Sequence, residues 1–300
     1  MNVNENVESC MKGAYDMHIH PAPDVLDRSG DDVEFARMAK EANMAGYLIK
    51  SHYVPTADRA YYARKLVPEV KVYGTISLNN SVGGMNSLAV DIAGRSNAKL
   101  VWFPTVDSVN EFQMRGKQDP SKLPFWAKMQ QELEEEHILK PPVQVFEENG
   151  KVSRETEEVL DRLIKYKMIL ATGHISPREG MELVKYARDI GVGKIIVTHA
   201  DFPTTLYTIE DQKKLAKMGA YLERCYTTPA TGKIPWEHVI KEVRETGPEN
   251  NIISTDLGQK TSILPVDGMR KFIKFFLDNG LSVDAVRKMT VENPSILLGD

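Results

Sequence analysis

Cysteine is scarce in this sequence of 300 residues, which contains only Cys10 and Cys225. Two cysteines do not indicate a disulfide framework, and their scarcity favours a reducing compartment. Long apolar runs are also lacking, since none approaches the roughly 18 residues that a membrane-spanning helix needs. Residues 1–8 are polar and acidic, without the basic and apolar regions of a signal peptide. We therefore expect a cytoplasmic protein with no membrane partner.

An excess of positive charge is lacking as well. The formal net charge is −4, which argues against a broad nucleic-acid-binding surface. Hydrophobic residues make up 42% of the chain and charged residues 27%, as is typical of a globular protein with a sizeable core. The expected partner is a small molecule, and a homo-oligomer stays open.

What the sequence does contain is a series of eight short apolar runs separated by helical patterns. One strand and one crossover helix need about 30 residues, and most intervals between the runs are close to this length. Strands that alternate with helices predict a parallel sheet covered by helices. Eight units favour a closed (β/α)8 TIM barrel over an open sheet, with residues 1–300 as one domain. The predicted strands are 14–19, 46–49, 70–76, 99–103, 167–171, 194–198, 219–223 and 251–255.

One interval is much longer than the others and predicts an insertion at 104–166, after the fourth strand. Within it we expect a helix at 125–137, a small hairpin with an Asn-Gly turn at 143–152, and a returning helix at 153–166. The insertion leaves the predicted barrel at the C-terminal ends of the strands, so it would form a lid or one wall of a pocket.

Two predicted helices have capping signals at their starts. Ser176 and Glu179 have the spacing of a capping box, with Pro177 at the first helical position. Thr56 is predicted to cap the helix that follows it. These signals are structural rather than functional.

Four of the seven histidines lie at the ends of predicted strands or directly after them. His18 and His20 stand one residue apart at the end of strand 1, and in a strand such residues share a face. His174 follows strand 5, His199 follows strand 6, and Asp256 follows strand 8. Each residue alone has a structural explanation, but side chains at the ends of barrel strands meet at one mouth. Imidazoles with one carboxylate are suitable ligands for Zn²⁺, and also for Mn²⁺ or Fe²⁺.

This set of ligands resembles that of the amidohydrolase superfamily of metal-dependent hydrolases, and residues 290–299 resemble its closing helix. The resemblance implies that His18, His20 and Asp256 bind one metal ion. It implies that His174 and His199 bind a second ion, or that His174 binds the single ion while His199 orients the substrate. Asp256 would take a proton from the metal-activated water and pass it to the leaving group. No particular substrate is implied.

Lys50 marks a departure from the superfamily pattern. Two-metal members carry a bridging carboxylated lysine or glutamate after strand 4, whereas strand 4 here ends Trp102-Phe103-Pro104-Thr105. Lys50 ends strand 2, and a lysine there needs a partner. It would bridge two metal ions after carboxylation, hold an anionic substrate group as a cation, or reach solvent.

Further candidates surround the same predicted mouth. His52 and Tyr53 follow Lys50 as substrate contacts, with His52 also a candidate metal ligand. Arg224 ends strand 7, and its guanidinium would suit a substrate carboxylate or form a salt bridge to a neighbouring acid. Asp201 and Gln259 are candidates to orient the ligands. Cys225 lacks a clear partner base and is expected to be packed.

The predicted function is a metal-dependent hydrolase that cleaves an amide, lactam, lactone or related bond of a small molecule. Asp256 is the predicted general acid and base, with Lys50 and His199 as further catalytic residues. The alternatives are a metal-dependent decarboxylase or hydratase acting on a carboxylate, a non-catalytic metal-binding barrel, and a phosphoesterase. One or two divalent ions fit the ligand set.

Overall fold

A computed structural model describes residues 3–115 and 125–300. Within this part all strand pairs are parallel. The strands are short and almost wholly buried, as expected for a parallel sheet covered by helices. Their bounds are β1 (Tyr15–Ile19), β2 (Gly46–Ile49), β3 (Lys71–Tyr73), β4 (Thr75–Ser77), β5 (Leu100–Trp102), β6 (Ile169–Ala171), β7 (Ile195–Val197), β8 (Tyr221–Cys225) and β9 (Asn251–Ser254).

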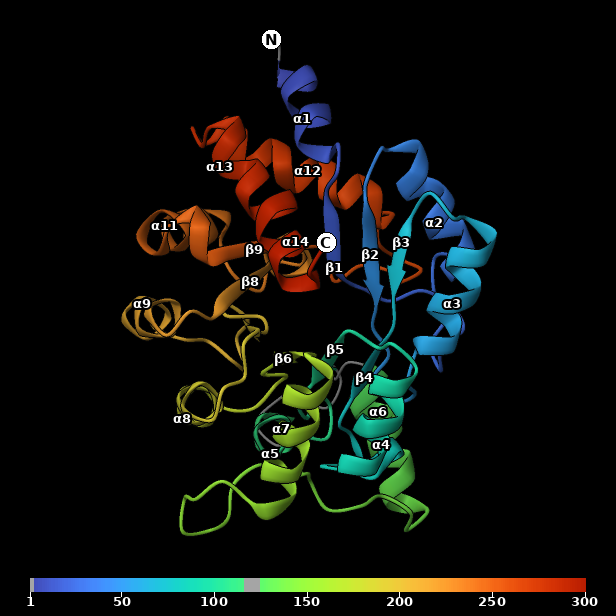
Figure 1. Cartoon of the computed structure of the whole chain (residues 1–300), viewed down its shortest axis with the longest axis vertical. Helices are drawn as coiled ribbons and strands as arrows, with labels where there is room; N and C mark the ends of the chain where they lie inside the picture. The colour runs from blue at the N-terminus through green and yellow to red at the C-terminus, as the bar shows by residue number, and fades with distance from the viewer. Residues whose placement is uncertain (1–2, 116–124) are drawn as a thin grey trace.

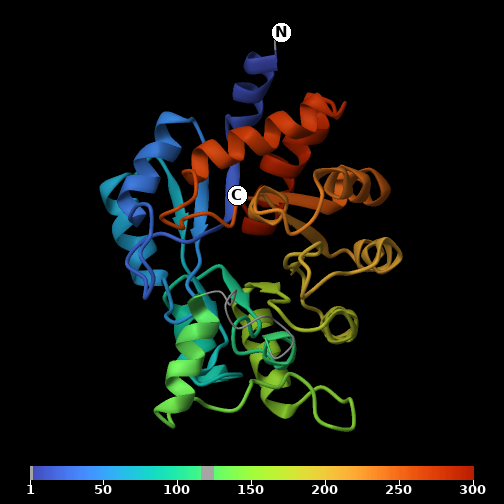
Figure 2. The same ribbon diagram turned by 180° about the vertical axis from the view of Figure 1, so that it is seen from behind.

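The helices form an outer layer around the strands, as two opposite views show (Figure 1, Figure 2). A helix follows almost every strand and returns the chain to the start of the next one. The α-helices are α1 (Val3–Met11), α2 (Asp32–Glu41), α3 (Ala57–Leu66), α4 (Ser87–Arg95), α5 (Val109–Arg115), α6 (Phe125–Glu135), α7 (Arg154–Tyr166), α8 (Pro177–Asp189), α9 (Ile209–Lys217), α10 (Thr227–Ala230), α11 (Trp236–Thr246), α12 (Pro265–Asp278), α13 (Val283–Arg287) and α14 (Asn293–Leu298).

The strands form a three-stranded sheet, β1-β2-β3, and a six-stranded sheet, β4 to β9 in chain order. The predicted strand 70–76 is thus divided into β3 and β4 at Gly74. A Cβ atom at Gly74 would lie 2.4 Å from Ala57 Cα, so only glycine lets the start of α3 approach this closely. β1 and β9, which are the end strands of the two sheets, lie side by side. The backbone amide of Asp256 donates to the carbonyl of His18 over 2.8 Å.

Side chains from both sheets pack in one inner cluster. Tyr15, Leu48 and Tyr73 come from the smaller sheet, and they pack with Trp102 and Ile196 of the larger one. The prediction of an α/β protein with parallel strands is therefore confirmed. The predicted strand 219–223 is shifted, since β8 extends to Cys225 and includes Arg224.

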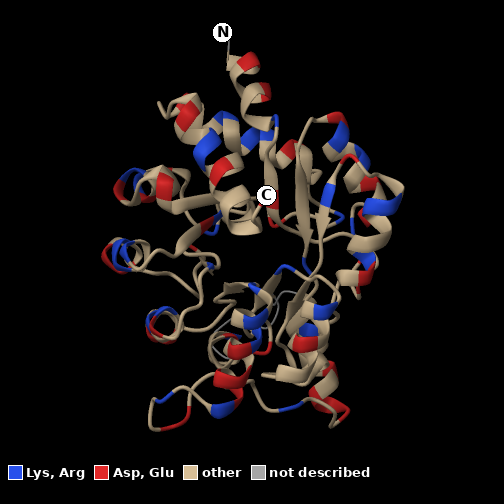
Figure 3. Cartoon of the chain, in the orientation of Figure 1, with Lys and Arg blue, Asp and Glu red and all other residues tan. Residues whose placement is uncertain are grey.

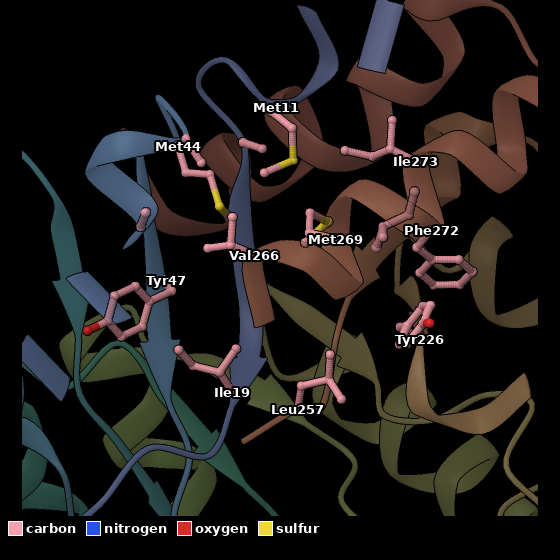
Figure 4. Packing of buried hydrophobic residues seen from close by; sticks show 14 of the residues in the cluster. Met11, Ile19, Met44, Tyr47, Tyr226, Leu257, Val266, Met269, Phe272 and Ile273 are labelled. Carbon is pink, nitrogen blue, oxygen red and sulfur yellow. The ribbon is translucent and has the colours of Figure 1, made fainter. Parts of the chain in front are cut away.

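A second layer of core packing lies between the smaller sheet and the helices around it. Ile19 and Tyr47 of the sheet, Met269 and Phe272 of α12 and Met11 of α1 belong to one buried cluster, which Figure 4 shows from close by. This burial of apolar surface attaches the first and last thirds of the chain to each other. It also supports the ends of β1 and β9, which carry the histidines and Asp256.

Charged side chains lie mainly on the outer helices, whereas the strands carry few of them (Figure 3). In the described ranges, no helix is long and apolar enough to cross a membrane. The placement of charge on the outer helices follows from the amphipathic helix patterns in the sequence.

The helix starts agree only in part with their sequence signals. Ser176 Oγ accepts from Glu179 N, and the Glu179 side chain accepts from Ser176 N, so the predicted capping box of α8 is confirmed. The prediction for Thr56 is wrong, because its hydroxyl donates to Ile49 O over 2.8 Å instead of capping α3. A buried hydroxyl beside a strand finds a carbonyl acceptor there.

The segment 104–166 contains α5, α6 and α7, of which α6 and α7 match the predicted helices. Phe146 and Val152 form an antiparallel bridge around the Asn149-Gly150 turn, as expected of a small hairpin. Residues 116–124 of the predicted insertion lie outside the described part.

Candidate metal centre and active site

The first half of the site lies at the end of β1, where His18 and His20 both contact Asp256. Their Nε2 atoms lie 3.2 and 3.0 Å from Asp256 Oδ1. The two rings are 5.2 Å apart between centroids. Asp256 follows β9, and the backbone contact between β9 and β1 places its carboxylate against the two histidines. The strand pairing thus brings together one carboxylate and two imidazoles.

The second half of the site adds the histidines that follow β6 and β7. His199 Nε2 lies 3.9 Å from Asp256 Oδ2, so this carboxylate is close to three imidazoles. The rings make a closed circuit of contacts, with neighbouring centroids 5.0 to 6.0 Å apart. In order around the circuit, the members are His18, His20, His52, His174 and His199.

Two buried carboxylates that the sequence interpretation missed contact histidines of this circuit. Glu223 Oε1 lies 3.2 Å from His18 Nδ1, and Glu111 Oε1 lies 3.0 Å from His174 Nδ1. A carboxylate at Nδ1 leaves Nε2 of the same ring for another partner, as in many metal sites. The signal for Glu223 was an acid inside an apolar strand, two residues from Cys225. Glu111 had no local signal, because its contact depends on how α5 packs.

Asp256 is held in a defined orientation. Thr227 Oγ1 donates to Asp256 Oδ2 over 3.0 Å, and Gln259 Nε2 donates to the Asp256 carbonyl over 2.9 Å. Its backbone is in the left-handed region, with φ 53°, as is that of His199, with φ 47°. Such strained positions in residues other than glycine gather at functional sites. Burial alone would raise the pKa of Asp256, but His18 and its neighbours outweigh this and hold the pKa well below its usual range.

Burial shifts three imidazoles of the circuit, those of His20, His174 and His199, toward their neutral form. Burial lowers the pKa of His20, and the Arg28 guanidinium lowers it further. Burial also lowers the pKa values of His174 and His199. A neutral imidazole carries a lone pair on one ring nitrogen, which is the form that binds a metal ion.

A metal ion fits this donor set. His18 Nε2, His174 Nε2 and His199 Nδ1 are buried without a hydrogen-bond partner in the described part of the chain. An unpaired buried polar atom costs free energy, so several at one place indicate a missing ligand. His18, His20 and Asp256 also present donor atoms within 4.8 Å of one another. Nitrogen and carboxylate donors suit a divalent transition metal.

A cavity of about 520 Å³ opens onto these residues. His20, His174, His199 and Asp256 lie in its wall, and Phe125 and Trp126 at the start of α6 also line it. The segment after β5 therefore contributes to the cavity, where a small molecule would meet the histidines. This volume is in the range of small-molecule sites.

Lys50, His52 and Tyr53 also line the cavity. Lys50 is only 1% exposed, which contradicts the alternative that it reaches solvent. Its Nζ lies 4.9 Å from the centroid of the Trp102 ring, and burial lowers its pKa. His52 Nδ1 is 2.8 Å from Thr105 Oγ1, and Tyr53 Oη is buried without a hydrogen-bond partner in the described structure.

Arg224 does not line the cavity, so the prediction that it contacts substrate needs correction. Its Nε donates to Asn251 Oδ1 over 2.8 Å, its Nη2 donates to Gln212 Oε1 over 2.6 Å, and Nη1 pairs with Glu242. Alternate residues of a strand face opposite sides, so Glu223 faces the site while Arg224 faces the helices. The salt-bridge alternative is the one observed.

Asp201, Gln259 and Cys225 are the remaining candidates from the sequence, and each has different contacts. Asp201 joins the Arg224 network, with its Oδ2 3.7 Å from Arg224 Nη1, and burial raises the pKa of Asp201 to about 7. Gln259 supports Asp256 as described above. Cys225 is a buried free thiol whose Sγ lies 3.9 Å from His18 Nδ1.

The fold is similar to that of several solved structures, among them an amidohydrolase and a probable dipeptidase. An amidohydrolase from Pseudomonas aeruginosa has a TM-score of 0.62 at 12% identity, over 100% of this chain and 99% of that one. The probable dipeptidase PvdM from the same organism has a TM-score of 0.61 at 11% identity, over 99% and 98%. The TatD homologue YJJV from Escherichia coli K12 has a TM-score of 0.52 at 13% identity, over 97% and 99%.

At the level of sequence, the chain belongs to the family of unknown function DUF6282, whose model matches residues 13–223. No protein with a curated description matches the sequence. The match contains the four histidines predicted as ligands, and Asp256 lies beyond it.

Proposed function

We propose that this protein is a metal-dependent hydrolase that cleaves an amide, lactam, lactone or related bond of a small molecule. The observation that carries the proposal is the meeting of the His18, His20 and His199 imidazoles around one carboxylate, Asp256, beside a cavity. The shared fold with amidohydrolases and a dipeptidase supports it.

His18, His20 and Asp256 would hold one divalent cation, zinc first, with manganese or iron as alternatives. His174 and His199 would hold a second cation, or His174 would complete a single site. When bound, the cation would act as a Lewis acid and lower the pKa of a water molecule. Lys50 would bridge two ions after carboxylation, or remain a cation that faces the substrate.

The protein's own side chains would orient the reactants and move the proton. Asp256 has a depressed pKa, so it is ionised at neutral pH and able to accept a proton. Thr227 keeps one of its oxygens in place, and the histidines contact the other. Tyr53 Oη, which has no hydrogen-bond partner within the described residues, would donate to a developing oxyanion.

We also infer that the two sheets form one closed (β/α)8 barrel. The inner cluster shared by both sheets supports this, as do the backbone hydrogen bonds between the segments that follow β1 and β9. Closure would place the ends of β1, β6, β7 and β9 around one mouth.

A metal count tests the centre directly. Protein purified without chelator should contain at least one equivalent of divalent metal by elemental analysis, and a His18→Ala/His20→Ala variant should contain less. One ion per chain would exclude a bridging Lys50, whereas two would support it. Wild-type protein that binds no added Zn²⁺, Mn²⁺ or Fe²⁺ would contradict the proposal.

The role of Asp256 needs a separate test. With a hydrolysed substrate from an amide and lactone panel, Asp256→Asn should lose at least about a hundredfold in kcat while retaining much of the metal. Wild-type kcat in this variant would show that Asp256 is not the general base.

Decarboxylation is the second candidate, favoured by the buried cation Lys50 in the cavity wall. The same metal ligands would serve decarboxylation of a carboxylate substrate, and the products would differ from those of hydrolysis. Release of CO₂ from a converted acid would replace the hydrolase proposal by this one.

A further inference from the structure

The charged residues of the cavity wall are mainly basic, with Asp27 and Asp256 as the acidic ones, whereas the whole chain has a net charge of −4. Four basic residues line the cavity: Arg28, Lys50, Lys233 and Lys260. Two of them have acidic partners, since Arg28 Nε lies 2.9 Å from Asp24 and Lys260 Nζ lies 3.1 Å from Asp27. Among the described residues, Lys50 and Lys233 have no ion-pair partner.

Lys233 is the unpaired cation that is not itself a candidate metal ligand. It follows α10, and its backbone amide donates to Thr228 O over 3.1 Å, which ties the loop to the helix. Its Nζ lies 4.1 Å from the centroid of the Phe202 ring, and that ring lies 5.3 Å from the His199 ring. The ammonium is therefore held one aromatic ring away from a histidine of the centre.

A cation–π contact orients an ammonium group but does not neutralise it. The Phe202 ring thus keeps Lys233 Nζ at the cavity wall with its charge available to a ligand. A negatively charged ligand group would gain a charge-assisted hydrogen bond at this position. In the proposed function Lys50 is also a candidate to bridge two ions after carboxylation, whereas Lys233 has no role there other than to face a ligand.

We propose that the substrate carries a carboxylate, that Lys233 binds it, and that Lys233 is therefore a specificity-determining residue. This inference rests on the proposed function, because it concerns the substrate of the same site. One isolated ammonium matches the single charge of a carboxylate, whereas a phosphate dianion calls for several basic donors.

Gln259 extends the inference to the rest of the ligand. Its Nε2 is engaged with the Asp256 carbonyl, while its Oε1 is buried without a hydrogen-bond partner in the described structure. That oxygen accepts hydrogen bonds only, so it suits an N–H or O–H of the ligand. A small amide with a carboxylate at its other end would use both Gln259 and Lys233.

The test compares matched acids and amides as ligands of metal-loaded protein. Succinate, glutarate and adipate are titrated by calorimetry against succinamide, glutaramide and adipamide, which have the same shapes without the charge. The proteins are wild type, Lys233→Met, Lys233→Arg, and the control Lys260→Met, which removes a cation of the same cavity that already has a partner. Thermal unfolding and elemental analysis establish that each variant is folded and loaded with metal.

Wild type should bind at least one acid about tenfold more tightly than its diamide. Lys233→Met should remove most of this preference without changing diamide binding, Lys233→Arg should restore part of it, and Lys260→Met should retain it. Wild type that prefers no acid, or a preference that survives Lys233→Met, would overturn the proposal. Inorganic phosphate bound more tightly than any acid, in a manner that depends on Lys233, would overturn the choice of a carboxylate.

These outcomes are independent of turnover. If the metal-loaded protein hydrolyses no amide or lactone, the preference for the acid and its dependence on Lys233 are still measured by binding. If metal and hydrolysis are found but acids and diamides bind equally, only the inference about Lys233 fails.

Discussion

At the scale of single residues, Glu223 shows how a buried carboxylate organises the centre. Its Oε1 lies 3.2 Å from His18 Nδ1, and its Oε2 accepts from His199 N over 3.4 Å. Burial alone would raise the pKa of Glu223, but His18 outweighs this effect and lowers the pKa. An ionised Glu223 requires a proton on His18 Nδ1, so the lone pair of that ring lies on Nε2, toward Asp256.

This arrangement predicts the effect of Glu223→Gln on metal binding. The glutamine keeps the shape but not the charge, so His18 becomes a weaker ligand. We expect the metal affinity to fall about 10- to 100-fold, measured by competition with a chromophoric chelator. Glu69→Gln, which changes an exposed carboxylate on the outer surface, is the matched control. Equal affinities in both variants would show that Glu223 does not support the ligand.

At the scale of elements, α8 connects β6, which precedes His174, to β7, which precedes His199. Its capping box satisfies backbone amides that would otherwise lack partners at the helix start. Ser176→Ala should therefore lower the free energy of unfolding by about 1 kcal/mol in denaturant titrations. Ser96 ends α4 through its backbone amide, so Ser96→Ala removes only an exposed hydroxyl and should change the free energy of unfolding by less than about 0.5 kcal/mol. Equal effects would contradict the capping role.

The turn after β9 is the second element on which the site depends. Gly258 has φ 133°, and a Cβ atom there would lie 1.9 Å from the His20 carbonyl oxygen. Gly258→Ala should destabilise the protein by more than about 1 kcal/mol and weaken metal binding, because His20 and Asp256 must move apart. The measurements are denaturant unfolding and metal titration.

Gly193→Ala is the control for this glycine. Gly193 lies in a loop, an added Cβ atom would meet no atom within 4 Å, and its φ is outside the left-handed region. The free energy of unfolding of Gly193→Ala should stay within about 1 kcal/mol of the wild-type value. Unchanged metal affinity in Gly258→Ala would show that the turn does not hold the two ligands together.

At the scale of the whole molecule, the candidate histidine ligands and Asp256 come from four places in the chain that only the folded state brings together. A metal ion would bind the folded protein and not the unfolded chain, and would therefore stabilise the fold. At a concentration about 100-fold above Kd, the gain is about 2.7 kcal/mol. Removal of the metal with chelator should lower the Tm by several degrees in calorimetry.

The same chelator should leave the Tm of His18→Ala/His20→Ala almost unchanged, because that variant lacks the ion to be removed. A wild-type Tm that does not respond to chelator or to added metal would contradict a metal centre built from separate strands.

Much of the architecture was predictable because strands and helices have different hydrophobic periods. The alternation of apolar runs and helical patterns indicated parallel strands, and the common phase of His18, His174, His199 and Asp256 indicated a shared site. The division at Gly74 was not predictable, because it depends on how closely the start of α3 approaches the strand.

The local sequence determined which residues end the strands, since that depends on periodicity and on neighbours along the chain. Packing between distant segments decided what each of these residues contacts. Glu111 reaches His174 through the placement of α5, Arg224 turns away into a network with Glu242, and Lys233 is placed over Phe202. Burial, charge and hydrogen bonding at these positions arise between residues far apart in the sequence. For that reason, only the tertiary structure separates a ligand's supporting carboxylate from a structural salt bridge.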